Sequence, residues 1–171
     1  LVTSMADRYS VILNDYNQGK GAAIRSGFEK ATGDIIIIQD ADLELDPNDY
    51  IILIEPIIKD KADVVFGNRF LNSHGNKLRY HSNYWGVRFL SFVSRILNGK
   101  KLSDIYIGYK VFTRDVIRAI IPHLKSNSFA IEAELTARVS PYRIAEVSVA
   151  YYPRTYAAGK KIRWTDGLRG L

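Results

Sequence analysis

The acidic turn at residues 40–46 carries the side chains best suited to chemistry. Asp40 and Asp42 stand one residue apart, directly after the β-branched run 35–38. Four β-branched residues without alternation are typical of a central parallel strand that is buried on both faces. The carboxyl end of such a strand faces the ligand crevice of an α/β sheet, where two carboxylates can hold a divalent cation and, through it, a diphosphate. The alternative is a polar turn of helix-capping acids, which we prefer for Asp46 before Pro47.

Composition narrows the kind of metal and the kind of partner. The 171 residues include no cysteine and only three scattered histidines. Thiolate ligands are therefore excluded and a histidine-rich zinc site is disfavoured, so we expect an oxygen-ligated Mg²⁺ or Mn²⁺. The length suits one domain with a sizeable core. The net charge of +6 suits a nucleic acid, an anionic membrane surface or a phosphorylated substrate.

A second candidate site is the glycine-rich turn that follows residues 9–13. This stretch, Tyr-Ser-Val-Ile-Leu, predicts a buried strand, and a helix that ends near Ala31 follows the turn. Gly19, Lys20 and Gly21 lie where the free N–H groups and the dipole of that helix favour an anion. The spacing matches neither the P-loop nor the dinucleotide-binding fingerprint. A helix start that is merely punctuated by glycines explains the spacing equally well.

The elements that must position both turns alternate between strand and helix. Strands at 9–13, 34–39 and 62–67, with a helix at 47–60, form the pattern of a parallel sheet. Further elements are expected downstream: helices at 83–97, 113–121 and 129–139, and strands at 106–112 and 142–152. The helix at 83–97 is aromatic, basic and amphipathic. Such a helix can lie on a membrane, but packing onto the sheet is commoner and is ranked first.

The basic segment 153–164 is a third candidate functional region. Four cations fall within its ten residues 154–163. A run of charge is usually solvated surface, yet one that follows a strand could clamp a diphosphate. Its interleaved aromatic residues also permit a binding module for nucleic acid or anionic lipid. Against nucleic acid, residues 40–46 concentrate negative charge where a nucleic-acid groove would avoid it.

Several segments, taken in order, resemble family 2 glycosyltransferases, and in particular the dolichyl-phosphate mannosyltransferase branch, which loads a hexose onto a polyprenyl phosphate. The segments that carry the resemblance are Gly19-Lys20-Gly21-Ala22-Ala23 with Arg25, Gln39-Asp40-Ala41-Asp42-Leu43-Glu44, Gly67-Asn68-Arg69-Phe70, Asp104 before Gly108-Tyr109-Lys110-Val111-Phe112, Glu132-Ala133-Glu134, and Tyr152-Pro153-Arg154-Thr155-Tyr156 through Gly159-Lys160-Lys161-Ile162-Arg163-Trp164-Thr165-Asp166-Gly167. No single segment is decisive, but the ordered set covers nearly the whole chain.

The resemblance implies roles for individual residues in several of these segments. Asp40 and Asp42 would hold the metal on the diphosphate of the sugar nucleotide, with Glu44 as a further ligand. The residues at the donor would be Gly19, Lys20, Gly21, Arg25, Asp40, Arg154 and Lys160. Arg69 and Arg79, with Arg154 and Lys160, would neutralise donor and acceptor phosphates. Asp104 would lie at the reaction centre as a base, as an orienter of a basic residue or as a structural cap.

The fold implied is a GT-A type, Rossmann-like α/β domain with a mostly parallel sheet flanked by helices. The family's first strand and its nucleoside-gripping acidic turn would precede residue 1, so we expect residues 1–171 to form one catalytic domain without its first βα unit. The implied partners are a nucleotide sugar, GDP-mannose or UDP-glucose, and a polyprenyl phosphate at the cytoplasmic face of a membrane, with no nucleic acid. The alternatives are a glycosyltransferase for a sugar or protein hydroxyl, a non-catalytic basic binding module and an inactive fragment that keeps the fold.

Overall fold

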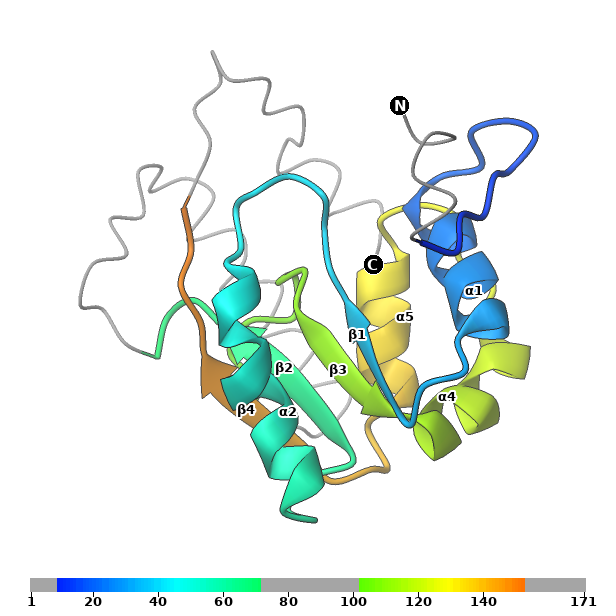
Figure 1. Ribbon diagram of the computed structural model, residues 1–171. Helices are drawn as coiled ribbons and strands as arrows, with labels where there is room; N and C mark the ends of the chain where they lie inside the picture. The colour runs from blue at the N-terminus through cyan, green and yellow to red at the C-terminus, as the bar shows by residue number, and fades with distance from the viewer. Residues whose placement is uncertain (1–8, 72–101, 153–171) are drawn as a thin grey trace.

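A four-stranded sheet lies between two layers of helices in the computed structural model, which describes residues 9–71 and 102–152 (Figure 1). The strands are β1 (Ile35–Ile38), β2 (Val64–Asn68), β3 (Lys110–Thr113) and β4 (Ile144–Ser148). The helices are α1 (Lys20–Lys30), α2 (Tyr50–Ile58), α4 (Arg114–Ile120) and α5 (Ile131–Arg138), with 3₁₀ turns η2 (Pro47–Asp49) and η3 (Ile121–His123). Arg79, Arg154, Lys160 and the segments 83–97 and 153–164 lie outside the described residues.

The sheet has the strand order β1-β3-β2-β4. β2 and β4 are parallel neighbours, whereas β3 runs antiparallel to both β1 and β2. β1, β2 and β4 therefore share one direction, and the sheet is mixed with three of its four described strands parallel. The chain passes from β1 through α2 to β2, as the alternating sequence pattern predicts, but β3 lies between these two strands.

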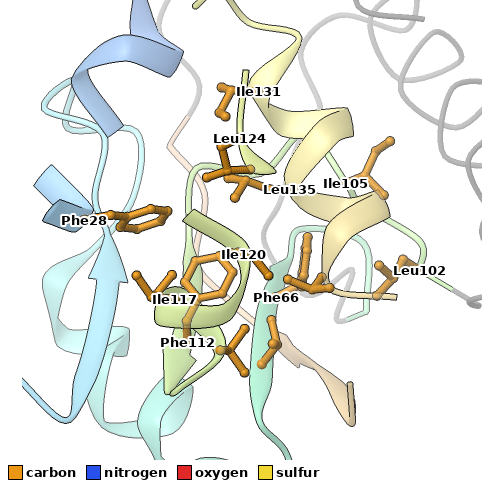
Figure 2. Close-up of a cluster of buried hydrophobic side chains, with 13 residues drawn as sticks. Phe28, Phe66, Leu102, Ile105, Phe112, Ile117, Ile120, Leu124, Ile131 and Leu135 are labelled. Atoms are coloured by element: carbon orange, nitrogen blue, oxygen red, sulfur yellow. The ribbon is translucent and has the colours of Figure 1, made fainter. Parts of the chain in front are cut away.

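Two hydrophobic clusters, one on each face of the sheet, hold the helices in place. On one face, α1, α4 and α5 cover β2 and β3, and Figure 2 shows Phe28, Phe66, Phe112 and Leu135 among the side chains of this cluster. Phe28 and Phe112 meet edge to face, with ring centroids 5.7 Å apart. On the other face, Leu53 of α2 packs with Val65 and Val111. Alternate residues of β2 thus face opposite cores, which explains why its sequence is continuously apolar.

The predicted helix starts are confirmed by their caps. The side chain of Asp46 accepts a hydrogen bond from the Asn48 N–H at 2.9 Å, and Pro47 opens the turn that leads into α2. The side chain of Thr113 accepts from the Val116 N–H at 3.4 Å at the start of α4. Both caps satisfy an N–H group that would otherwise lack a partner in the first turn.

Two predictions about strands are wrong. Residues 9–13 form no strand, and Tyr9, Ile12 and Leu13 are exposed rather than buried. β1 is half-buried and, among the described residues, lies at the end of the sheet with β3 as its neighbour, so it is not a central strand buried on both faces. An apolar run indicates that a segment favours burial. Whether the segment forms a central strand, an edge strand or no strand depends on pairing partners that lie far away in the sequence.

Candidate active site

The acidic turn begins where β1 ends, and its first carboxylate lies against the backbone of Gly108. A Cβ atom at Gly108 would lie 2.5 Å from Oδ2 of Asp40, so the carboxylate could not keep this position beside a larger residue. Gln39 donates a hydrogen bond to the carbonyl oxygen of Asp40 at 2.6 Å and accepts one from the Tyr50 hydroxyl at 3.1 Å. The start of the acidic turn therefore contacts Gly108, which precedes β3, and is linked through Gln39 to Tyr50 of α2.

Asp40 is the outer end of a chain of four alternating charges. Nζ of Lys20, at the start of α1, lies 2.9 Å from Oδ1 of Asp40 and 2.6 Å from Oε1 of Glu132. The other oxygen of Glu132 accepts from Nζ of Lys110, which also donates to the Ile107 carbonyl at 2.6 Å. Glu132 and Lys110 are buried. Burial alone would raise the pKa of Glu132, but the charges of Lys110 and Lys20 hold that pKa below its ordinary value.

The glycine-rich turn lies against the backbone of residues 126–127. Gly19 has a φ of 92°, and a side chain at Gly19 or Gly21 would meet this backbone. The carbonyl oxygen of Asn127 accepts from the N–H groups of Gly21 at 2.8 Å and of Ala22 at 3.4 Å. These N–H groups already have an acceptor within the protein, so an anion at this turn would depend on Lys20.

Arg25 also points to the segment 126–127. Its guanidinium donates to the carbonyl oxygen of Ser126 and to the side-chain oxygen of Asn127. These contacts fix α1 to the segment that leads into α5. The donor-binding role predicted for Arg25 stays a prediction.

Arg69 and Asp104 form a two-point ion pair at the carboxyl end of β2. Nε and Nη2 of Arg69 each lie 2.7 Å from one carboxylate oxygen of Asp104, whose side chain is fully buried. The loop that carries Asp104 is tied to the sheet by Glu146, whose Oε1 accepts from the Ser103 N–H at 2.8 Å and from Asn68 at 3.0 Å. The orientation of the Arg69 guanidinium is therefore set by a buried carboxylate.

Tyr151 joins this ion pair to the acidic turn. Its hydroxyl donates to Oε2 of Glu44 at 2.9 Å, and the guanidinium carbon of Arg69 lies 4.9 Å from the centre of its ring. Burial raises the pKa of Tyr151 to about 12 despite the opposing charge of Arg69, so the hydroxyl is protonated and donates at neutral pH. Within the turn, Oδ1 of Asp42 accepts from the Glu44 N–H at 3.2 Å.

The acidic turn suits a hard divalent cation, provided that a ligand completes the coordination. In the described part of the chain, no group of three or more His, Cys, Asp or Glu side chains is gathered as a ready metal site. Mg²⁺ is commonly bound by one or two carboxylates together with substrate phosphates and water, and Mn²⁺ accepts the same oxygen ligands. Asp40 and Asp42 can supply that share. The close approach of the Asp40 carboxylate to the backbone of Gly108 restricts the position of this carboxylate, as a metal ligand would require.

The structure brings Lys20 to Asp40 and Arg69 to Asp104, all four of which the sequence analysis named as candidates, and it adds three residues to them. The sequence analysis did not assign Lys110, Glu132 or Tyr151 to the site. Lys110 lies among apolar residues of β3, and Glu132 lies between Ile131 and Ala133 on α5. A charged residue within an apolar run signals a buried ion pair, so the sequence held a clue to these two. It held none that linked Tyr151 to Glu44.

A mixed α/β sheet flanked by helices, with carboxylates after one strand and an Arg–Asp pair after another, is a GT-A-like fold. The sequence profile of Glycosyl transferase family 2 matches residues 2–121. The chain belongs to this family.

Curated relatives extend the likeness beyond the matched profile. Dolichyl-phosphate beta-glucosyltransferase ALG5D of Trichomonas vaginalis is 31% identical over 166 residues, which covers 88% of this chain and 49% of that protein. UDP-N-acetylglucosamine–dolichyl-phosphate N-acetylglucosaminyltransferase of Methanococcus voltae is 29% identical over 143 residues, with 81% and 57% covered. The chain spans about half the length of these relatives.

Solved structures support the fold. Glucosyl-3-phosphoglycerate synthase from Mycobacterium tuberculosis matches with a TM-score of 0.60 at 18% identity, over 86% of this chain and 51% of that chain. The same enzyme in complex with Mn²⁺, UDP and phosphoglyceric acid matches with a TM-score of 0.58. Among the residues described here, no helix is both long and apolar enough to cross a lipid bilayer.

Proposed function

We propose that the protein is an inverting glycosyltransferase that moves a hexose from a nucleotide sugar to a polyprenyl phosphate. The observation that carries the proposal is the pairing of the site's buried carboxylates with cations. Both oxygens of Asp104 contact Arg69, and Glu132 is shared by Lys20 and Lys110. The names of the two curated relatives, which describe transfer to dolichyl phosphate, support the same acceptor class.

This pairing bears on the choice between a phosphate and a hydroxyl acceptor. A hydroxyl acceptor needs a base within hydrogen-bond reach whose pKa lies near the working pH. Glu132 has its pKa held low by two lysines, and Asp104 is occupied by a guanidinium. A phosphate acceptor is already mostly ionised at neutral pH, with a second pKa of about 6, and needs no base. It needs cations that allow two phosphate groups to approach.

The donor diphosphate would lie at the acidic turn. Asp40 and Asp42 would hold Mg²⁺ or Mn²⁺ together with the donor phosphates, with Glu44 as a further ligand, and the ion would supply charge neutralisation for the departing diphosphate. Lys20 would keep the Asp40 carboxylate oriented. Gly19, Gly21 and Arg25 support the start of α1, and Arg79, Arg154 and Lys160 remain predicted phosphate contacts.

In the proposed reaction, an acceptor phosphate oxygen attacks the anomeric carbon in line. The bond between that carbon and the donor phosphate oxygen breaks, and its electron pair leaves with the nucleoside diphosphate. The product is a hexosyl phosphopolyprenol with inverted configuration. Arg69, oriented by Asp104, would offset the negative charge where the two phosphates meet.

The partners follow from this reaction. The donor would be GDP-mannose or UDP-glucose. The acceptor is anchored in a membrane by its polyprenyl chain, so the protein would make peripheral contact with a membrane, at its cytoplasmic face.

The test is sugar transfer by the intact protein to a short polyprenyl phosphate in the presence of Mn²⁺. Radiolabelled GDP-mannose, UDP-glucose and UDP-N-acetylglucosamine are supplied in parallel. Asp42→Asn should abolish lipid-linked label. Asp46→Asn is the matched control, because asparagine can replace this helix cap and should keep the activity. If no donor labels the lipid although the protein is folded, the polyprenyl acceptor is wrong, and a hydroxyl acceptor or a binding role takes its place.

A further inference from the structure

Tyr151 is the side chain that contacts both ends of the candidate site. Its hydroxyl donates to Oε2 of Glu44 at 2.9 Å, and its ring lies 4.9 Å from the guanidinium carbon of Arg69. Glu44 belongs to the acidic turn, and Arg69 belongs to the ion pair after β2. The residue itself is 9% exposed, so both contacts are made largely away from water.

The backbone around Tyr151 is fixed to the same turn. Tyr151 forms an isolated antiparallel bridge with Leu45, and the N–H group of Tyr152 donates to the carbonyl oxygen of Glu44 at 2.8 Å. The segment that follows β4 therefore runs beside the segment that leads into α2 (Figure 1). Both the main chain and the hydroxyl restrain Glu44.

Packing alone does not account for the hydroxyl. The ring of Tyr151 belongs to the second hydrophobic cluster, where phenylalanine would fill the same space. The hydroxyl donates to a carboxylate of the acidic turn and is also hydrogen-bonded with the Arg69 guanidinium. A group that orients a metal-binding carboxylate in this way commonly changes metal affinity by about 10- to 100-fold when it is removed.

We propose that Tyr151 is a positioning residue that couples the carboxylate end of the site to its cationic end. Its hydroxyl orients Glu44 toward the donor diphosphate, and its ring holds the plane of the Arg69 guanidinium toward the acceptor phosphate. This inference rests on the proposed function. Tyr151→Phe removes the hydroxyl and its contacts with Glu44 and Arg69, whereas Tyr151→Leu also removes the ring beneath Arg69.

The hydroxyl is tested with Tyr151→Phe in the intact protein. The affinity for Mn²⁺ is measured by water-proton relaxation in the presence of UDP and, separately, of GDP. We expect Tyr151→Phe to weaken Mn²⁺ binding by about tenfold. In a Glu44→Gln background the same substitution should have no further effect, because its acceptor has already been altered. A merely structural role would give equal losses in both backgrounds.

Tyr142→Phe is the matched control. Tyr142 precedes β4, whereas Tyr151 follows it, so this substitution removes a tyrosine hydroxyl at the opposite end of the same strand. It should leave Mn²⁺ affinity unchanged. Urea unfolding of each variant shows whether a loss of binding reflects a loss of folded protein.

The ring is tested with Tyr151→Leu. Tyr151→Phe loses the hydroxyl contact with Arg69 but keeps an aromatic face beneath the guanidinium. Tyr151→Leu removes the ring as well, so it should raise the KM for polyprenyl phosphate several-fold above the value for Tyr151→Phe. Unchanged Mn²⁺ affinity in Tyr151→Phe, equal losses in the two backgrounds, or a wild type that binds no Mn²⁺ overturns the coupling. Absence of sugar transfer by the wild type overturns the proposed function instead, whatever the Mn²⁺ titration gives.

Discussion

Nζ of Lys20 lies 2.6 Å from Oε1 of Glu132, although 111 residues separate the two in the sequence. Lys20 opens α1 and Glu132 lies in the first turn of α5, so this ion pair joins two helices on the same face of the sheet. The two carboxylates and two lysines of the charge chain balance each other. This set of four charges is thus neutral only while every member is present.

Glu132→Gln should destabilise the protein by about 3–5 kcal/mol, because it leaves Lys110 buried without its counter-charge. Urea unfolding measures the loss. The double variant Glu132→Gln, Lys110→Met removes the unpaired charge together with its partner and should recover a large part of the stability. If the double variant is less stable than the single one, the argument from uncompensated charge is wrong.

Arg69→Lys should lower kcat/KM for polyprenyl phosphate by about 100-fold while the fold persists. Lysine keeps the charge but cannot make the two-point contact with Asp104, so the position of the cation is no longer fixed. Steady-state kinetics with varied acceptor measures the effect. Arg118→Lys, at an exposed position of α4, is the matched control and should be neutral.

Gly108→Ala should weaken donor and Mn²⁺ binding, because the added Cβ would occupy the place of the Asp40 carboxylate. Isothermal titration with UDP and Mn²⁺ measures the change. Gly27→Ala offers the control, since no atom lies within 4 Å of the Cβ it would add and it sits inside α1. That variant should gain about 0.5–1 kcal/mol in the free energy of unfolding and bind the donor normally. Equal binding by both variants would contradict the role given to Gly108.

Acid should remove a part of the stability that depends on Asp63. Hydrogen bonds from Arg143 hold the pKa of Asp63 below its ordinary value, so the folded protein binds fewer protons there than the unfolded chain. This contribution is complete above the ordinary pKa of about 3.9 and is lost as the pH falls through the lower folded value. The free energy of unfolding, measured between pH 5 and pH 2, should fall less steeply with decreasing pH in Asp63→Asn than in the wild type. Parallel slopes would contradict the linkage.

The sequence alone determined the local features of this protein. The apolar runs placed β1 and β2, and Asp46 and Thr113 marked helix starts that the structure confirms. The order of short motifs was enough to indicate the family, which the profile match shows. Such features depend on neighbours a few residues apart, and backbone geometry and capping bonds are encoded at that range.

Only the tertiary structure decided which distant residues meet. It inserted β3 between β1 and β2, paired Lys20 with Glu132, and placed the Tyr151 hydroxyl on Glu44. Residues 9–13 carry an apolar pattern that predicts a strand, yet they form none in the described chain. An apolar pattern states that a segment prefers burial but does not specify its partner. Pairing between distant segments depends on how the whole chain closes its loops and satisfies its buried charges, and no single stretch encodes that.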